Sequence, residues 1–482
     1  MTKTTISIQR ALCAALCAAA LAGCAVGPDY AKPKLDIPAS FKEDGRWKTA
    51  EPQDAMPRGD WWSVFHDQTL NGLMDTLNRQ SPTIAQAEAQ YREAQAQLRQ
   101  AQAGLFPSLS ANAAKTRGVS TPGGGAATAY NLGLSASWEV DLWGAVRREV
   151  EAGKAKQQAS EAQLAAIRLS SQAQLATAYL QLAVADAQLA NLRASEKLLA
   201  DTLQLTRNQY AAGIVGDDAV ASAESQWKTS QAATVDKQLT RAQLEHAIAA
   251  QLGQAPASFA LPPAAQAPYL PQIPAGLPST LLERRPDIAA AERNMAAANA
   301  QIGIAKAAFF PTLSLGASGG YRGSSFADWV SLPNRIWSVG PSLALTLFDS
   351  GLRSAQTDQA VASYDASVAS YRQTVLSALQ GVEDNLSAQS LLEQEAGMQS
   401  AALAAAKRAE AISLNQYQAG TVAYLNVLSA QNTRINAENN LWSVKNRQYA
   451  SSVALIAALG GSWAPPRSHE KNRACARFFH PP

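Results

Sequence analysis

The chain has 482 residues, 16% of them charged, and a formal net charge of +3. A balance this close to neutral, with no face of clustered Lys and Arg, excludes the electrostatic footprint of a nucleic-acid-binding protein. The sequence contains only four histidines and no nucleophile elbow, zinc motif or Walker loop, so we expect no enzyme activity.

Residues 1–23 have the pattern of a signal peptide. Lys3 and Arg10 precede an apolar stretch from Ala11 to Ala20, and the small residues of Leu21-Ala22-Gly23-Cys24 follow. This tetrapeptide resembles a bacterial lipobox, in which Cys24 becomes the lipidated first residue of the mature chain. The alternative is a plain signal peptide with an incidental cysteine. Ala25, rather than Asp, at the next position implies sorting to the outer membrane.

From residue 24 to residue 60 the chain is rich in Pro and lacks a periodic pattern, which predicts an extended arm behind the lipid anchor. A helix with one apolar stripe is predicted next, formed by Trp61, Trp62, Phe65, Leu70, Leu73 and Leu77. A second helix is predicted from Pro82 to Leu105, since proline suits the first turn of a helix.

Four stretches alternate between apolar and polar residues and predict β-strands at about 107–118, 130–141, 311–322 and 337–349. In the clearest of them, Tyr130 to Asp141, every second residue from Tyr130 to Val140 is apolar and those between are small or polar. The pattern suits both a transmembrane β-barrel and a half-buried sheet of a soluble domain. Four strands leave two open edges, so a barrel must close with further copies of the chain. Three copies give about twelve strands and an aqueous passage.

Long coiled-coil-like helical hairpins are predicted at 144–253 and 351–460, with heptad seams that include Leu175, Leu182 and Leu189, and the run from Val361 to Val382. A helix of this kind is roughly 100 Å long. The sequence repeats itself: NQYAAGIV at Asn208 returns as NQYQAGTV at Asn415. We therefore expect two repeats, 61–253 and 285–463.

The Pro-rich stretch 254–284 predicts a linker between the repeats. The tail 464–482 has no periodicity and predicts no ordered structure. His469 and Cys475 in the tail lack further ligands at a usable spacing, so no metal site is expected. No cofactor is expected apart from the covalent lipid on Cys24.

Several motifs together resemble the TolC-like outer-membrane factors, and in particular the OprM/NodT-type lipoproteins of resistance-nodulation-division efflux systems. The resemblance runs in order from residue 21 to about Trp463, and its motifs are Leu21 to Cys24, Gly27-Pro28-Asp29-Tyr30, Trp61-Trp62, Trp138 to Gly144, Leu282 to Ile288 and the two glycine tips.

The resemblance implies a mixed α/β membrane protein with the TolC-like fold. Four transmembrane strands per chain would form a twelve-stranded barrel in a homotrimer, with a long periplasmic α-helical barrel and an equatorial belt built by the Pro-rich segment and the chain ends. It also implies a periplasmic adaptor and an inner-membrane, proton-driven transporter as partners. The protein would be the passive exit duct for small molecules such as drugs, anchored by lipid in the outer membrane of a Gram-negative bacterium.

The resemblance further implies a gate at the periplasmic tips. Candidate gate residues are Tyr417, Asn426, Ser429, Asp217 and Asp218. Asn426 and Ser429 stand where relatives often carry carboxylates, and the two aspartates have an alternative role as a solvated turn or helix N-caps. The tips expected to contact the adaptor are Gly213, Ile214, Val215, Gly420, Thr421 and Val422.

Two other functions fit parts of the sequence. One is an outer-membrane duct for type I protein secretion or for another ABC-type exporter, although the lipobox and the Gly-Pro-Asp-Tyr segment favour efflux. The other is a structural coiled-coil lipoprotein without a pore, which explains the heptads but leaves the four amphipathic strands unexplained.

Overall fold

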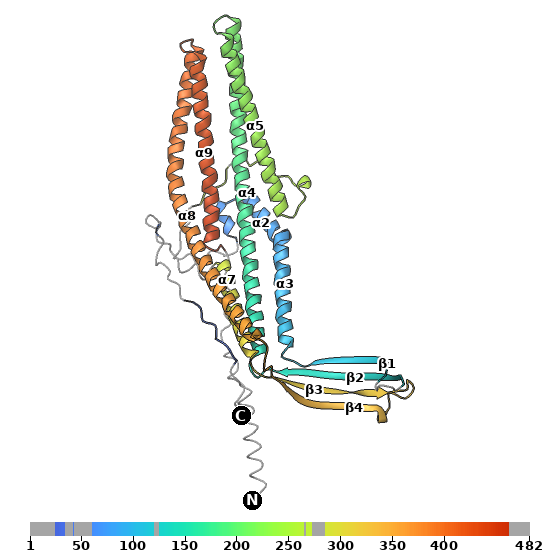
Figure 1. Ribbon diagram of the computed structural model, residues 1–482. Coiled ribbons are helices and arrows are strands. Elements are labelled where there is room, and N and C mark those ends of the chain that lie inside the picture. The colour runs from blue at the N-terminus through green and yellow to red at the C-terminus, as the bar shows by residue number, and fades with distance from the viewer. Residues whose placement is uncertain are drawn as a thin grey trace, which may run out of the picture. The chain divides into compact units, whose positions relative to one another are not determined.

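The computed structural model describes residues 25–33, 42, 60–119, 125–264, 267–271 and 285–461. The predicted signal peptide, Cys24 and the tail 464–482 lie outside these ranges. The helices are α2 (Gln68–Gln80), α3 (Pro82–Ala103), α4 (Ala145–Ala211), α5 (Asp217–Gln251), α7 (Pro286–Ala307), α8 (Leu352–Gln418) and α9 (Tyr424–Ala458), and the strands are β1 (Ser108–Gly118), β2 (Ala127–Val140), β3 (Thr312–Gly323) and β4 (Arg335–Ala344) (Figure 1).

The helices form pairs of equal length along the chain. α3 and α7 have 22 residues each, α4 and α8 have 67, and α5 and α9 have 35. Within the described residues, no helix combines the length and the apolar composition needed to cross a bilayer.

The chain divides into two compact units, and each takes segments from both repeats. The sheet unit contains residues 1–35, 90–161 and 290–373, and the helical unit contains residues 36–89, 162–289 and 374–482. The sheet unit therefore holds all four strands, and the helical unit holds both hairpin tips. Each unit is therefore built from both repeats rather than from one.

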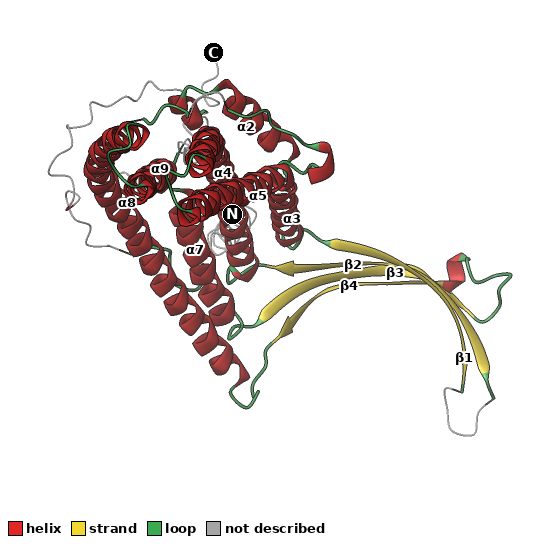
Figure 2. Ribbon diagram, turned by 90° about the horizontal axis from the view of Figure 1, so that it is seen from above, coloured by secondary structure: helices red, strands yellow, loops and turns green. Residues whose placement is uncertain are grey.

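The sheet is antiparallel in the order β1-β2-β3-β4 (Figure 2). The register aligns residues of the same face on neighbouring strands. On the apolar face, one such row consists of Ala111, Leu134, Gly319 and Trp337. Ser110, Ser135, Ser318 and Ser338 form the adjacent row on the polar face. Both faces are largely exposed, and β1 and β4 are edges of the sheet within the protomer.

Three strand boundaries differ from the prediction by more than one residue, and one of them is the start of β4 at Arg335 rather than at 337. β2 begins at Ala127, because this residue pairs with Gly118 at the end of β1. β4 ends at Ala344 rather than near 349, because Ala344 pairs with Thr312, the first residue of β3. Within the part of the chain that the structure describes, no strand pairs with the residues after Ala344.

The helix predicted to start at Trp61 is divided in two. Trp61–Phe65 form a short 3-10 helix, His66 takes a left-handed conformation with a φ of 52°, and α2 follows. The Asp67 side chain accepts the Leu70 N–H at 2.9 Å and so caps α2. It also accepts a hydrogen bond from the Tyr179 hydroxyl at 2.8 Å, which joins this segment to α4.

The heptad seams are buried over most of their length. Leu175, Leu182 and Leu189 of α4 are almost inaccessible to solvent. In α8 the seam is buried from Tyr371 onward, whereas Val361 at its predicted start is 38% exposed. The seam of α8 therefore packs within the protomer only over its second part.

Candidate functional site

Both hairpin tips use the same turn. The turn glycine has a φ of +71° at Gly213 and +72° at Gly420, a conformation that glycine adopts without strain. In each tip the next residue donates its N–H to the carbonyl five residues earlier, at 2.9 Å. This is the Schellman geometry that ends a helix, and it gives the repeated Tyr-x-x-Gly pattern a physical reason.

The predicted adaptor-contacting residues lie at these turns. Gly213, Gly420 and Thr421 are exposed, and Ile214 exposes 68% of its surface, a large fraction for an apolar side chain. Val215 is half-buried, and so is Val422, which packs against the tip cluster described next.

Tyr417 lies in an apolar cluster between the two hairpins, which we call the tip cluster. The buried members of the cluster are Leu203 and Ala223 of the first hairpin and Tyr417, Tyr424 and Val427 of the second. The hydroxyls of Tyr417 and Thr206 are 3.2 Å apart, and the Tyr417 and Tyr424 rings are 5.5 Å apart between centroids. Desolvation by burial, followed by the proximity of Tyr417, raises the pKa of Tyr424 to about 12.

Away from the tip, Arg434 of α9 forms a buried polar junction. Its Nε lies 2.7 Å from Glu410 Oε2 of α8 in an ion pair, and its Nη1 donates to Glu438 Oε2 at 2.8 Å. Its Nη2 donates to Ser195 Oγ of α4 at 3.0 Å. The Arg434 side chain is 8% exposed and the Glu410 side chain is 9% exposed. One arginine therefore connects α8, α9 and the first hairpin.

The other predicted gate residues are not part of the tip cluster. Asn426 and Ser429 are exposed on α9. Asp217 and Asp218 are exposed in the first turn of α5, where the helix dipole favours a negative charge. They are not N-caps, because that position is occupied by Gly216. Within the described ranges, no group of three or more His, Cys, Asp or Glu side chains could hold a metal ion.

In the sheet unit, the segment that follows Cys24 packs tightly against the helix ends. A Cβ on Gly27 would lie 2.5 Å from the Cα of Gly303 in α7, and a Cβ on Gly144 would lie 2.7 Å from the Cα of Ala25. The Val26 N–H donates to the Trp143 carbonyl at 3.0 Å. Only glycine permits these approaches, so the segment has a fixed seat beside the junction of β2 and α4.

Polar side chains hold the same segment. The Arg148 side chain is 5% exposed, and its guanidinium donates to Asp29 Oδ1 at 2.9 Å and to the Val26 and Gly27 carbonyls at 3.4 Å. Asn299 donates to the Pro28 carbonyl at 3.0 Å. Lys32 pairs with Glu292 at 3.0 Å.

Four residues of these contacts were not predicted from the sequence: Arg148, Asn299, Gly303 and Arg434. The first three contact the Gly-Pro-Asp-Tyr motif from positions more than a hundred residues away, and no periodic pattern marks them. The sequence does indicate that Arg434 is buried, because it follows the spacing of a buried helical seam formed with Tyr424, Val427 and Gln431. A charged residue on such a seam indicates a buried pair.

Comparison with known proteins matches this architecture. A model of the outer membrane efflux protein family matches residues 73–254 and 277–461. The antibiotic efflux pump outer membrane protein ArpC of Pseudomonas putida is 30% identical over 473 residues, 96% of each chain. Outer membrane protein OprJ of Pseudomonas aeruginosa is 30% identical over 474 residues, 94% of this chain and 96% of OprJ.

A solved structure of the outer-membrane channel OprN is 31% identical and superposes with a TM-score of 0.84, covering 91% of this chain and 99% of OprN. The chain therefore belongs to the outer membrane efflux protein family and has the TolC-like fold of its channels.

Proposed function

We propose that this outer-membrane efflux protein is the passive exit duct of a tripartite pump. Three copies would form the duct, docked to a periplasmic adaptor and an inner-membrane, proton-driven transporter, and would export small molecules such as drugs. The observation that carries the proposal is the sheet. It has one apolar and one polar face, both exposed, and two unpaired edges, so it is complete only when further copies close it in a lipid environment.

Three copies are proposed because the number of strands determines the width of the passage inside the barrel. Two chains would give eight strands, whose interior side chains fill, whereas three would give twelve and leave room for water. The test is the mass of the purified, lipidated protein in detergent together with its conductance in planar bilayers. A trimer with small, mostly closed currents supports the duct. A monomer, or a trimer that never conducts, contradicts it and favours a structural lipoprotein.

We also propose that Cys24 carries the lipid anchor. The docked segment supports this, because Ala25 lies against Gly144, where the sheet ends and α4 begins. Consecutive Cα atoms are 3.8 Å apart, so a lipid on Cys24 would start at the foot of the membrane-facing sheet. Mass spectrometry of the mature N-terminal peptide tests the assignment. An unmodified Cys24, or cleavage at another bond, contradicts it.

The gate is proposed at the tips and involves Tyr417, Asn426, Ser429, Asp217 and Asp218. Tyr417 supports this role because its hydroxyl contacts Thr206 of the other hairpin, so moving one hairpin against the other must break the contact. The adaptor would dock on the turns at Gly213, Ile214 and Val215 and at Gly420, Thr421 and Val422. Disulfide crosslinking of cysteine variants at Ile214 to a co-expressed adaptor tests the docking, and the exposed Asp236 is a control position away from the tip.

A further inference from the structure

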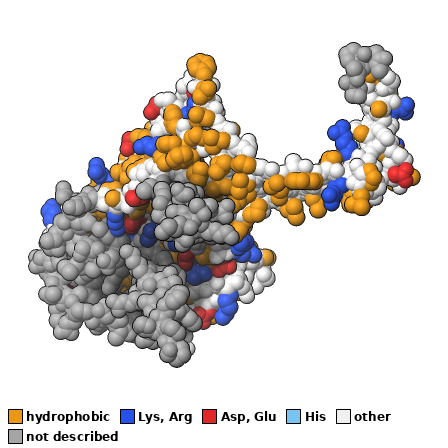
Figure 3. All heavy atoms as spheres, turned by 90° about the horizontal axis from the view of Figure 1, so that it is seen from below, with side chains coloured by type: hydrophobic (Ala, Val, Ile, Leu, Met, Phe, Trp, Pro, Cys, Tyr) orange, Lys and Arg blue, Asp and Glu red, His pale blue; other side chains and the backbone are white. Residues whose placement is uncertain are grey.

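The apolar face of the sheet carries basic residues at its hairpin end. Lys115 and Arg117 of β1 and Arg335 of β4 are exposed and lie on the same face as Leu132 and Leu134. Figure 3 shows apolar side chains along the sheet and Lys and Arg side chains toward its far end. Within the described residues, no ion pair involves these three cations. Of the charged groups of these three residues, that of Lys115 lies over the Tyr130 ring, 5.5 Å from its centroid. Their charges are therefore available to a ligand.

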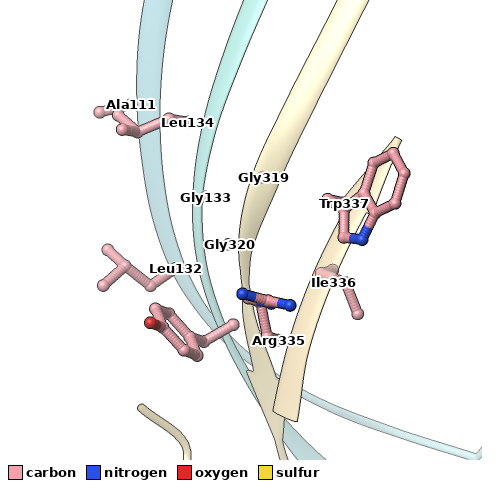
Figure 4. Close-up of a pocket in the computed structure, with 10 residues that line it drawn as sticks. Ala111, Leu132, Gly133, Leu134, Gly319, Gly320, Arg335, Ile336 and Trp337 are labelled. Atoms are coloured by element: carbon pink, nitrogen blue, oxygen red, sulfur yellow. The ribbon is translucent and has the colours of Figure 1, made fainter. Parts of the chain in front are cut away.

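A groove lies on this face beside Arg335, with a volume of about 730 Å³. The backbone of Gly319 and Gly320 in β3 forms its floor, Leu132 and Leu134 line one side, and Trp337 lines the other (Figure 4). The groove exists because Gly319 lacks a side chain between Leu134 and Trp337, its neighbours in the register. A Cβ added at Gly319 would meet no atom within 4 Å.

The groove combines an apolar channel with a cation at one end. Arg335 is the only charged residue in its lining, and no carboxylate lines it. A guanidinium binds a phosphate through paired N–H donors, and an apolar channel fits a hydrocarbon chain. Charge and shape are therefore complementary to a lipid with a phosphate near the start of an acyl chain.

The membrane orientation of the proposed duct identifies the leaflet. β2 leads into α4 and β4 leads into α8 at one end of the sheet, so the hairpin end that carries Arg335 lies at the opposite end. If the helices extend into the periplasm, this end reaches the outer leaflet, where the lipids of Gram-negative bacteria are phosphorylated, acylated glycolipids.

We propose that the groove binds an acyl chain of a phosphorylated glycolipid of the lipid A type, with the lipid phosphate held by Arg335. Lys115 and Arg117 add positive charge along the same end of the face. The inference rests on the proposed function, because that function supplies the orientation in the membrane. It gives the barrel a specific lipid contact, separate from the duct.

The test measures lipids retained by the purified, lipidated protein after incubation with mixed micelles of lipid A or of phosphatidylglycerol, by native mass spectrometry. We expect preferential retention of lipid A. Arg335→Gln should reduce it by about tenfold, as expected for loss of a charge-assisted contact. Gly319→Leu, which fills the groove, should reduce it similarly, whereas Arg335→Lys should retain an intermediate amount.

Gly340→Leu is the matched control. Gly340 also has open space around its missing Cβ but lies on the polar face of the sheet. Equal retention in the wild type, Arg335→Gln and Gly319→Leu would overturn the groove, and equal retention of phosphatidylglycerol would overturn the glycolipid assignment. Trimer mass and conductance are recorded on the same samples. If the wild type neither trimerises nor conducts, the proposed function fails. If the wild type conducts but Arg335→Gln and Gly319→Leu retain as much lipid A as the wild type, the lipid site alone is refuted.

Discussion

Replacing Arg434 by Met should open the junction between the two hairpins. The substitution removes the cation that faces Glu410 and Glu438 and breaks the hydrogen bond to Ser195. Removing one member of a buried ion pair costs about 3–5 kcal/mol, because the remaining charge stays desolvated. Arg434 and Glu410 are 8% and 9% exposed, so this buried range applies to them.

Hydrogen exchange followed by mass spectrometry measures the effect where it arises, because local openings have their own free energies. A loss of about 3 kcal/mol corresponds to amide exchange more than about a hundredfold faster. We expect this increase in peptides that cover residues 424–440. The double variant Arg434→Met with Glu410→Leu should recover much of the protection, since an apolar pair replaces the stranded carboxylate.

Arg447→Met is the matched control. Arg447 pairs with Glu395 across the same two helices at 3.1 Å, but the two side chains are 58% and 38% exposed. An exposed pair contributes about 0–1 kcal/mol, so exchange should rise less than about sixfold. If Arg434→Met and Arg447→Met gave equal exchange rates, burial would not determine the strength of the junction, and our reasoning would be refuted.

Three further predictions concern single residues. Tyr417→Phe loses a contact worth about 1 kcal/mol and should raise the closed-state conductance, as should Ser429→Ala; unchanged single-channel currents in both would remove these residues from the gate. Arg148→Gln should free the segment 25–33 and make it sensitive to protease, unlike Lys156→Gln at an exposed position of the same helix; equal protection would show that Arg148 does not hold the segment. Because the pKa of Tyr424 is raised to about 12, its neutral form is favoured in the folded state, so stability should fall as pH rises from about 10 to 12. Tyr424→Phe should remove up to about 2 kcal/mol of that loss, measured by unfolding at pH 8 and pH 11.5, and an unchanged difference between the two pH values would exclude Tyr424 as its source.

The fold was predictable to the extent that it depends on local pattern. Strand alternation and heptads locate the strands and the long helices, and the sequence repeat identifies two tips with one geometry. The end of β4 at Ala344 was not predictable from alternation, because a strand also requires a partner, and the protomer offers none beyond Thr312. His66 broke the expected helix at Trp61 by taking a left-handed conformation that apolar spacing does not reveal.

The candidate site was predictable only in part. Tyr417 was identified, but its partner Thr206 lies 211 positions earlier and carries no motif. The seat of the N-terminal segment depends on the close approach of Gly27 to Gly303, which follows from the packing of helices that sequence spacing does not determine. Contacts between the two repeats therefore account for most of what the sequence did not reveal.

The register of the sheet places one uncharged row of hydroxyls across its polar face, whose charged residues include Glu139 of β2 and Arg322 of β3. Ser110, Ser135, Ser318 and Ser338 cross all four strands in one row, and the Oγ atoms of the first two and of the last two are 2.8 Å apart. Each of these hydroxyls has a hydrogen-bond partner on the neighbouring strand, and serine side chains take up little space. In a closed trimer, a solute passing this row would meet neutral hydroxyls, so the row itself would not select by charge.

A charge placed on the serine row tests whether this row lines the duct. Ser135→Asp would place one carboxylate per chain on the neutral row, and three in the closed ring, where they attract cations and repel anions. We expect the reversal potential in a salt gradient to shift toward cation selectivity, and the shift to shrink at high ionic strength because salt screens the charges. A reversal potential that does not move would mean that the serine row does not face the conducting path, and that the polar face of the sheet is not the wall of the duct.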